Sequence, residues 1–485
     1  MSFITPTTKL PYLPKDQRKK ILLLSDDCRL HSGVATMSRE IIQKTAHHFN
    51  WVQLGAALNH PEFGKVFDLS AETNKLSQIT DASVKIYPYN GYGDPNVLRQ
   101  LIQIEAPDVI MHFTDPRYWI WLYQMEYELR TTYNIPLVYY TIWDDLPYPF
   151  YNKPFYASCD ALYCISKQTY NIVNNVLGKE LAATKQIKYI PHGIDSKVFF
   201  PIDENDDELK KFRSKLFGDI KKYQFVVLYN NRNIRRKNAS DLIAAFDKFT
   251  KSTNRDDCVL VMKTHPIDDN GTNLYEVAKM INPNMNIVWI PEPLSPMHMN
   301  YLYNIADVTV NISSNEGWGL SSTESMMAGT MIINNVTGGL QDQCRFEDEN
   351  GKWIDFDDEF SSNHIGRYET HGKWCRPIFP SNRSIQGSPL TPYIFDDRVD
   401  IHDLSVALWD TLIDKLQRPD EFKKNGLAGR EWAMSQEARM ESQMMADSIG
   451  ESINELLALC SPMSHYSTFE VKFEETPQYN GIIYN

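Results

Sequence analysis

The sequence is poor in cysteine, and its cysteines are not spaced like metal ligands. Seven cysteines are scattered over 485 residues, and no two of them form a CxxC pair. An odd and scattered set argues against a disulfide framework and against a zinc site. We therefore expect a protein without a bound metal that works in a reducing compartment.

Long apolar runs are also missing from the sequence. The clean apolar run nearest the start is ILLL at 21–24, far below the roughly 20 residues that a bilayer-spanning helix needs. The first residues, MSFITPTTKLPYLPKDQRKK, contain no apolar core of a signal peptide. These features predict a cytoplasmic protein without a transmembrane segment.

Basic residues are in the minority. The chain has 49 Lys and Arg against 62 Asp and Glu, a formal net charge of −13 at pH 7. Proteins that wrap nucleic acid through phosphate contacts usually carry a basic balance or stripe. Here the basic residues gather locally, at 15–20 and 231–238. That distribution favours a small anionic ligand, although it leaves a local groove for DNA open.

Short β-rich runs alternate with helical patterns along most of the chain. In the first half they lie at 21–25, 51–57, 84–89, 108–113, 137–143, 161–166 and 187–191. After a charge-rich capped helix at 201–222, the runs resume at 225–230, 258–263, 286–290, 307–312 and 330–335. Strands separated by helices predict parallel sheets covered on both faces, hence two doubly wound α/β domains.

The domain boundaries follow from this rhythm. We place the first domain at 1–200, the second at 201–440, and a C-terminal helix with a tail at 441–485. The segment 345–400, rich in Pro, Gly, Asn and Ser, is expected to be an irregular insertion. Two facing α/β domains create a cleft at the carboxyl ends of both sheets, which is where open α/β folds bind ligands. The loops that follow the strands therefore hold the candidate site residues.

One such loop gathers cations in front of a predicted helix. The stretch NRNIRRKN (231–238) places Arg232, Arg235, Arg236 and Lys237 between a strand and a helix N-terminus. A helix N-terminus attracts anions, and arginine and lysine side chains suit the oxygens of a diphosphate. The alternative is an ordinary solvated basic turn.

A second loop carries two glutamates in SSNEGWGLSSTESMMAGT (313–330). Ser321 followed three residues later by Glu324 reads as a capping box at a helix start. That reading leaves Glu316 unexplained, because it stands directly before glycines that let backbone amides approach a ligand. A carboxylate there can accept hydrogen bonds from hydroxyl groups, which sugars present in quantity.

The first loop, SDDCRLHSGVATMSRE (25–40), puts Gly33 where the first strand turns into the first helix. It is not a GxGxxG sequence, so the dinucleotide fingerprint of an oxidoreductase is absent. An ordinary strand-to-helix turn is the alternative for Gly33.

Together these motifs resemble a known family. The chain is similar to the retaining glycosyltransferases of the GT-B fold, specifically family 4 (glycosyl transferases group 1), over most of residues 20–455. The most specific likeness is NEGWGLSSTESMMAGT, where the family reads Glu-Gly-aromatic-Gly-Leu, then Glu, then Ala-Gly. HSGVAT (31–36), IPHGID (190–195) and NNRNIRRKN (230–238) follow in the family's order.

The resemblance implies an architecture and an activity. It implies two Rossmann-like domains facing a central cleft, with a C-terminal helix returning to the N-terminal domain. The first domain would hold the acceptor and the second the nucleotide-sugar. The enzyme would be a retaining hexosyl- or pentosyltransferase with no obligatory metal or cofactor, using a UDP-sugar in preference to a GDP-sugar.

The resemblance also implies residue roles. Arg232 and Lys237 would neutralise the departing diphosphate, Glu316 would hold the donor sugar, and these three form the catalytic set. The donor-binding set is Gly33, Gly317, Trp318, Gly319, Leu320 and Glu324, with Glu324 on the ribose hydroxyls. The acceptor-side candidates, taken from the loops of the first domain, are His112, Asp115, Asp144 and Asp145.

The acceptor stays open at the level of sequence. A glycan or lipid-linked saccharide is preferred, and a hydroxymethylated DNA base, which would have to be flipped out of the duplex, is the alternative. A catalytically silent nucleotide-sugar-binding protein with the same fold is the alternative of another class. The aromatic run YWIWLYQMEY (118–127) could stack on a ligand, but a buried helix is preferred.

Overall fold

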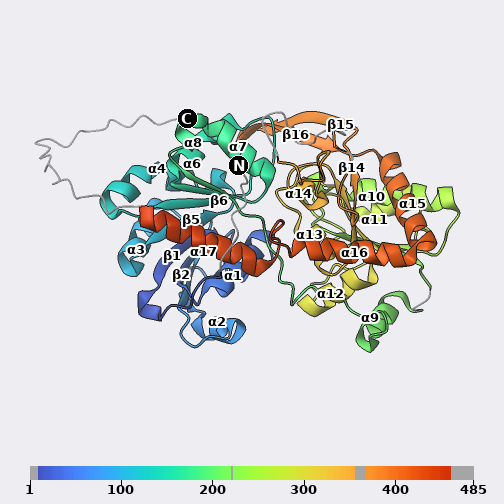
Figure 1. The fold of residues 1–485 in the computed structure, drawn as a ribbon, viewed down its shortest axis with the longest axis horizontal. Coiled ribbons are helices and arrows are strands. Elements are labelled where there is room, and N and C mark those ends of the chain that lie inside the picture. The colour runs from blue at the N-terminus through green and yellow to red at the C-terminus, as the bar shows by residue number, and fades with distance from the viewer. Residues whose placement is uncertain (1–8, 220–221, 356–366, 369, 460–485) are drawn as a thin grey trace, which may run out of the picture.

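Two α/β domains lie side by side in the computed structural model, joined by long connections on one face (Figure 1). The structure describes residues 9–219, 222–355, 367–368 and 370–459. The predicted fold of two α/β domains built on parallel sheets is confirmed. In the described part of the chain, no helix combines the length and apolar character needed to cross a bilayer.

The N-terminal domain is built on an eight-stranded sheet with the order β3-β4-β2-β1-β5-β6-β7-β8. Its strands are β1 (Lys19–Asp26), β2 (Phe49–Ala57), β3 (Phe67–Asp68), β4 (Val84–Asn90), β5 (Val109–Phe113), β6 (Leu137–Thr141), β7 (Ala161–Cys164) and β8 (Gln186–Tyr189). Its helices are α1 (Gly33–Thr45), α2 (Ser70–Ser77), α3 (Pro95–Glu105), α4 (Ile120–Gln124), α5 (Glu126–Glu128), α6 (Lys153–Ser158), α7 (Lys167–Leu177) and α8 (Lys179–Ala182).

The C-terminal domain repeats the plan with a six-stranded sheet of order β11-β10-β9-β12-β13-β14. Its strands are β9 (Phe225–Asn230), β10 (Cys258–Lys263), β11 (Ile287–Trp289), β12 (Val308–Asn311), β13 (Met331–Asn335) and β14 (Cys375–Ile378), with a hairpin of β15 (Asn382–Ser388) and β16 (Thr391–Arg398). The helices from the linker onward are α9 (Asp207–Phe217), α10 (Ala239–Thr253), α11 (Leu274–Ile281), α12 (Pro296–Ile305), α13 (Leu320–Met327), α14 (Leu340–Cys344), α15 (Ile401–Gln417), α16 (Pro419–Ala433) and α17 (Ser442–Leu459).

The burial of the strands explains why their apolar runs predict them correctly. The ILLL run of β1 is fully buried, because β1 pairs in parallel with β2 and β5 in the middle of the sheet. Parallel strands covered on both faces appear as continuous apolar runs. Both sheets are parallel throughout except for the short β3, which pairs antiparallel to β4. The carboxyl ends of both sheets therefore face the interdomain cleft.

The predicted helix at 201–222 is confirmed as the shorter α9. Asp206 caps its N-terminus by accepting a hydrogen bond from the Leu209 N–H at 2.9 Å, and Gly218 ends it. The preference for a buried helix at 118–127 is only partly confirmed, because the run is divided between the short helices α4 and α5. Trp119 and Leu122 are fully buried, whereas Tyr118, Ile120 and Tyr127 are exposed.

The expectation of an irregular insertion at 345–400 is wrong for part of its length. Strand β14 completes the second sheet, and the antiparallel hairpin β15–β16 follows it. Residues 356–366 and 369 lie outside the described residues. The hairpin escaped prediction because β15 is polar and largely exposed, and because the short Tyr-Ile-Phe run of β16 does not alternate with polar residues.

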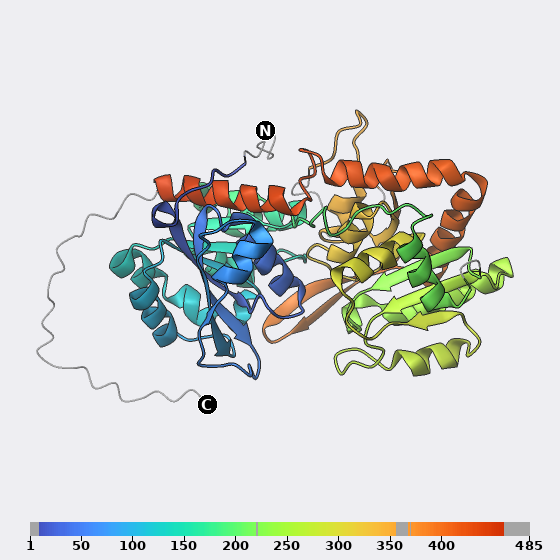
Figure 2. The same cartoon turned by 90° about the horizontal axis from the view of Figure 1, so that it is seen from below.

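The C-terminal helix returns to the N-terminal domain, as expected. Figure 2 shows α16 along the second domain and α17 along the first. Helix α17 packs against α1, the Leu10 N–H bonds to the Asp447 carboxylate at 3.3 Å, and Ile449 is fully buried. The predicted tail at 460–485 lies outside the described residues.

We expect Ile449→Ala to lower the free energy of unfolding by about 2–5 kcal/mol, because it leaves a cavity under α17. Urea unfolding followed by circular dichroism measures the change. Leu459→Ala is the matched control, since Leu459 is 77% exposed at the end of the same helix. Equal stability of the two variants would contradict the docking of α17.

Candidate active site

A cavity of about 820 Å³ lies between the domains, at the carboxyl ends of both sheets. Its lining comes from loops far apart in the sequence. On the N-terminal side these are Ser32–Val34, Asp115–Arg117, Ile142–Asp145, Ile165 and His192. On the C-terminal side they are Asn230, Asn231, Arg236, Lys237, Asn315–Ser321, Glu324, Gln386–Ser388, Thr391 and Ile394. The cavity therefore has the position that open α/β folds use for ligands.

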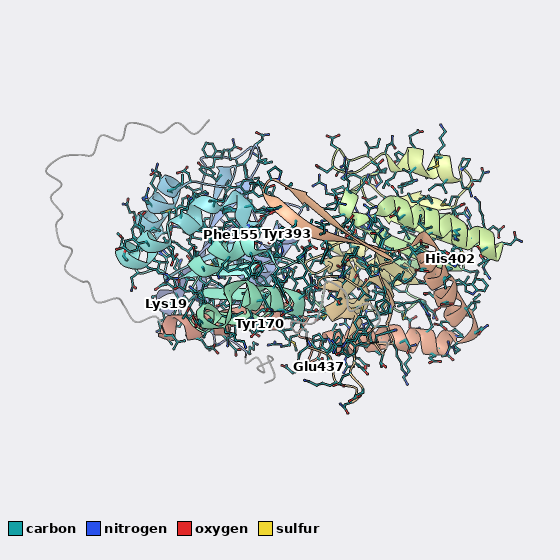
Figure 3. All side chains as sticks on the ribbon, turned by 90° about the horizontal axis from the view of Figure 1, so that it is seen from above. Lys19, Phe155, Tyr170, Tyr393, His402 and Glu437 are labelled. Atoms are coloured by element: carbon teal, nitrogen blue, oxygen red, sulfur yellow. The ribbon has the colours of Figure 1, made fainter. Side chains whose placement is uncertain are left out.

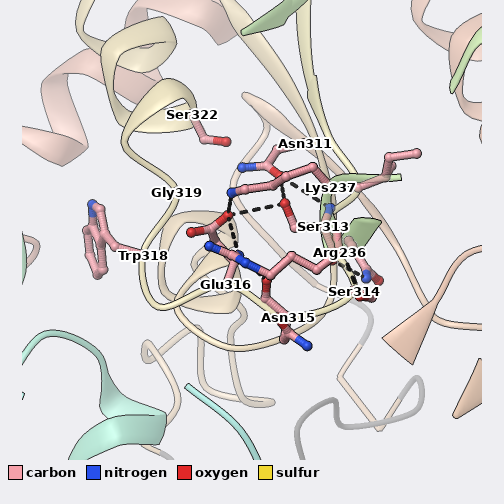
Figure 4. Close-up of polar contacts among 12 residues, drawn as sticks. Arg236, Lys237, Asn311, Ser313, Ser314, Asn315, Glu316, Trp318, Gly319 and Ser322 are labelled. Carbon is pink, nitrogen blue, oxygen red and sulfur yellow. Dashed lines mark hydrogen bonds and ion pairs between the residues drawn. The ribbon is translucent and has the colours of Figure 1, made fainter. Parts of the chain in front are cut away.

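Glu316 is the centre of a buried charge cluster in this cavity (Figure 4). It forms an ion pair with Lys237, and its Oε2 accepts a hydrogen bond from Ser313 Oγ at 3.1 Å. Arg236 Nη1 lies 3.5 Å from the same oxygen and donates to the Asn315 carbonyl at 2.7 Å. Two cations thus converge on one carboxylate, leaving a net positive charge beside it.

The backbone around the cations fixes this arrangement. Arg235–Lys237 form a single 3-10 turn, which ends at Asn238 with φ +51°. Asparagine is among the few residues with a side chain that adopt this left-handed conformation readily. The Asn238 side chain also donates to the Ile312 carbonyl at 3.0 Å, which ties the basic loop to the end of β12. Burial and the neighbouring Arg236 lower the pKa of Lys237, whereas the adjacent Glu316 carboxylate favours the charged form, so the ion pair keeps Lys237 a cation.

Two glycines that the sequence analysis did not single out press against the glutamate loop. A Cβ atom at Gly338 would lie 2.1 Å from the Glu316 carbonyl oxygen, and one at Gly339 would lie 2.1 Å from the Gly317 carbonyl oxygen. The Gly339 N–H donates to the Glu316 carbonyl at 2.9 Å. Only glycine fits this approach, and the consecutive pair in TGGL after β13 was the available signal.

The glutamate loop also meets the N-terminal domain. A Cβ atom at Gly317 would lie 3.0 Å from the Ile142 carbonyl oxygen, at the end of β6. Gly33, at the start of α1, faces Leu320 with 3.4 Å between its would-be Cβ and the leucine Cδ1. The structure therefore brings together the first loop and the glutamate loop, two motifs that are almost 300 positions apart in the sequence.

The capping box expected at Ser321 and Glu324 is wrong. Helix α13 begins at Leu320 after Gly319, which has φ +88°, so Ser321 already lies inside the helix and makes no capping bond. Glu324 instead accepts a hydrogen bond from Tyr303 Oη at 2.5 Å, and Asn230 Nδ2 donates to the same tyrosine oxygen at 2.7 Å. Burial raises the pKa of Glu324 to about 7.

Arg232 is not among the residues brought together at the cavity. Its side chain is 62% exposed and pairs with Asp268, with 2.7 Å between Nε and Oδ2. Arg236, four residues on, occupies the cavity wall instead. Trp318 does line the cavity, and its Nε1 donates to Thr323 Oγ1 at 3.0 Å.

The acceptor-side candidates divide into two groups. Asp115, Asp144 and Asp145 line the cavity, whereas His112 is fully buried beneath it, with Nδ1 2.7 Å from Tyr123 Oη. His192, from the IPHGID motif, does line the cavity and had not been proposed as a site residue. Its Nδ1 lies 2.8 Å from Tyr140 Oη, and burial lowers the pKa of its imidazole to about 3, so the ring is neutral.

Three buried polar atoms on the cavity wall have no hydrogen-bond partner among the described residues. They are Asn231 Nδ2, Ser321 Oγ and Asp145 Oδ1. Buried polar groups are nearly always paired, so orphans around one cavity indicate a polar ligand. In the described ranges, no three His, Cys, Asp or Glu side chains are grouped as metal ligands.

Two facing Rossmann-like domains with this central cleft define the GT-B class of fold. The comparisons with solved structures agree: the chain matches a sucrose-phosphate synthase from Thermosynechococcus elongatus with a TM-score of 0.63, at 16% identity over 91% of this chain and 100% of that one. It matches Anabaena Alr3699/HepE in complex with UDP and glucose with a TM-score of 0.61, at 13% identity over 90% of this chain and all of the other. At such identities the likeness establishes the fold.

The sequence comparisons cover part of the chain. Residues 210–366 match the family model described as "Glycosyl transferases group 1", which includes the basic loop and the glutamate loop. The alpha-monoglucosyldiacylglycerol synthase of Acholeplasma laidlawii is 28% identical over 146 residues, which are 30% of this chain and 34% of that protein. The chain thus spans about a third of that relative's length. The predicted resemblance to GT-B glycosyl transferases group 1 is confirmed for the fold and for this segment.

We expect Lys237→Met to destabilise the second domain by about 3–5 kcal/mol, because it leaves the Glu316 carboxylate buried without its closest partner. Urea unfolding measures this change, with Arg235→Met as the matched control on the exposed side of the same turn. Equal losses in both variants would mean that the buried ion pair does not matter for stability.

Proposed function

We propose that the protein is a retaining glycosyltransferase that moves a sugar from a UDP-sugar to a hydroxyl group. The observation that carries the proposal is the Glu316 carboxylate held between Lys237 and Arg236 at the base of an interdomain cavity. A carboxylate suits sugar hydroxyls, and the surplus cation suits a diphosphate. The two requirements of a nucleotide-sugar are therefore met within one cluster.

The side chains of the C-terminal wall define one orientation for the bound donor. Arg236, Lys237 and the N-terminal end of α13 face the diphosphate, whose oxygens match the guanidinium fork and the free helix N–H groups. The free oxygen of Glu324 takes the ribose hydroxyls, while its other oxygen is held by Tyr303. UDP is the preferred nucleotide because Alr3699/HepE, with the same fold, was crystallised with UDP and glucose.

The reaction breaks the bond between the anomeric carbon and the diphosphate oxygen and forms one to the acceptor oxygen. The departing diphosphate takes the acceptor's proton, so attack occurs on the same face and the anomeric configuration is retained. Arg236 and Lys237 stabilise the negative charge that develops on the leaving group. The cavity orients the two substrates and excludes water. Since side chains supply the positive charge, we propose that no metal is required.

The direct test is release of UDP from UDP-glucose and other UDP-sugars with a panel of hydroxyl acceptors, in the presence of EDTA. We expect turnover, with retention in the product measured by NMR, and a loss of about 100-fold in kcat for Glu316→Gln. Tight donor binding without any turnover would favour a silent nucleotide-sugar-binding protein. Inversion, or a strict need for added metal, would contradict the mechanism.

We expect Arg236→Ala to weaken UDP binding about 10- to 100-fold, because it removes a charged hydrogen-bond donor from the diphosphate site. Arg232→Ala, in the same loop, should change the dissociation constant less than about threefold, since its side chain is exposed and paired with Asp268. Calorimetric titration measures both. A larger loss of UDP affinity in Arg232→Ala than in Arg236→Ala would indicate that Arg232, not Arg236, binds the diphosphate.

Donor affinity should fall as the pH drops below about 7, because ribose hydroxyls donate to an ionised Glu324 and its pKa is about 7. The loss approaches tenfold per pH unit, measured by calorimetry with UDP-glucose, whose diphosphate does not titrate in this range. Glu324→Gln is the control: it should bind weakly at pH 8 and lose the pH dependence. The same raised pKa means that the folded state holds the extra proton, so this group's contribution to stability decreases as pH rises from about 4.5 to 7.

A further inference from the structure

The hairpin β15–β16 joins the two sides of the cavity. Its base is fixed to the C-terminal domain through Asp397, whose N–H donates to the Ser314 carbonyl at 3.0 Å, directly beside the glutamate loop. Asn335 Nδ2 donates to the Asp397 carbonyl at 2.9 Å, and Thr337 Oγ1 donates to its carboxylate at 3.0 Å. The hairpin is therefore positioned by the same segment that carries Glu316.

The second strand of the hairpin is held by the N-terminal domain. Figure 3 shows it reaching across to the first domain, where the ring centroid of Tyr393 lies 4.9 Å from that of Tyr151. The Phe395 N–H donates to the Leu146 carbonyl at 2.7 Å, Tyr393 Oη donates to the Tyr148 carbonyl at 3.2 Å, and Tyr151 Oη donates to the Tyr393 carbonyl at 2.8 Å. These contacts fix the hairpin to the loop that directly follows Asp144 and Asp145.

The end of the hairpin enters the cavity with uncharged side chains. Gln386, Gly387, Ser388 and Thr391 line it, as do Asp144 and Asp145. The strand register shifts between Gln386 and Ser388, and a Cβ atom at Gly387 would lie 2.4 Å from the Pro392 carbonyl oxygen. The register shift therefore lies at residues that line the cavity and carry no charge.

Most of the titratable side chains on the N-terminal wall of the cavity are acids, namely Asp115, Asp144 and Asp145. Asp145 is 5% exposed and its Oδ1 has no partner among the described residues, although it lines the cavity. Burial raises the pKa of Asp145, and the adjacent Asp144 raises it further. Arg117 is the cation of this wall among the described lining residues, and it is held by Asp115, with 2.8 Å between Nε and Oδ1, and by Thr391. Arg236 and Lys237 belong to the donor side with Glu316.

We propose that the hairpin end and the Asp144–Asp145 loop form the acceptor subsite, and that this subsite selects an uncharged saccharide and rejects sugar phosphates. The inference rests on the proposed glycosyl transfer. Saccharide hydroxyls can donate to Asp145 and exchange hydrogen bonds with Ser388 and Gln386, which satisfies the orphaned carboxyl oxygen. A phosphate group would instead bring its negative charge to a wall whose cations are already held, Arg117 by Asp115 and Arg236 by Glu316 and the Asn315 carbonyl, so its burial there is unfavourable.

The test uses paired acceptors with a UDP-sugar donor that the protein binds. Glucose, fructose, mannose and maltose are each compared with a phosphorylated counterpart, and kcat/KM is measured from UDP release. We expect the neutral member of an accepted pair to be favoured about 100-fold or more. Equal or better use of the phosphorylated member overturns the inference. Donor binding with no turnover of any saccharide also overturns it, in favour of a lipid or nucleic-acid acceptor.

A pair of variants tests the hairpin itself. Ser388→Arg places a cation in the subsite and should raise kcat/KM for the sugar phosphate about tenfold while lowering it for the neutral sugar. Ile385→Arg is the matched control on the same strand, because Ile385 is 66% exposed and does not line the cavity. Equal behaviour of the two variants overturns the role of the hairpin. UDP affinity, measured for all three proteins, separates the outcomes: absent donor binding in the wild type refutes the proposed function, and with it this inference.

Discussion

The buried ion pair between Glu316 and Lys237 is the interaction on which the site depends. The Glu316 side chain is only 11% exposed, so its carboxylate is costly to bury without a partner, and Arg236 and Ser313 complete its environment. The pair requires two loops from different strands to meet at hydrogen-bond distance. That requirement accounts for the left-handed Asn238 at the end of the basic turn and for the glycines packed against the glutamate loop.

The same loops set the relation between the domains. Behind the glutamate loop, Asp342 at α14 accepts hydrogen bonds from the Lys167 N–H and from Tyr189 Oη, both at 3.0 Å and both from the N-terminal domain. Burial raises the pKa of Asp342 to about 7. Together with the hairpin and α17, these contacts join the domains on several sides of the cavity. The wall proposed to bind the donor is thereby held across the cavity from the loops proposed to bind the acceptor, as a transfer between two bound substrates requires.

The architecture could be predicted because it depends on burial, which the sequence records locally. Buried parallel strands such as β1 and β9 appear as uninterrupted apolar runs, and their loops identified the positions of the site. The paired glutamates could be located from their glycine-rich motif and its resemblance to the family. The apolar pattern does not predict where a side chain points within an irregular loop.

Three outcomes illustrate that limit. Arg232 points outward because Asp268, from a distant loop, holds it, whereas Arg236 turns toward Glu316. The helix after Gly319 starts before Ser321, because the glycine's positive φ ends the loop earlier than a serine cap would. The hairpin is stabilised by long-range contacts such as the hydrogen bond from the Phe395 N–H to the Leu146 carbonyl, which leave no periodic pattern in the sequence. Each depends on residues that are distant along the chain.

The measurement that tests the central claim most directly is a crystal structure of the protein with UDP. The account predicts the diphosphate between Arg236, Lys237 and the N-terminal end of α13, with the ribose hydroxyls on the free oxygen of Glu324. Glu316 should remain paired with Lys237 and face the space where the donor sugar would lie. UDP bound at another surface, or an empty interdomain cavity at saturating UDP, would contradict the account.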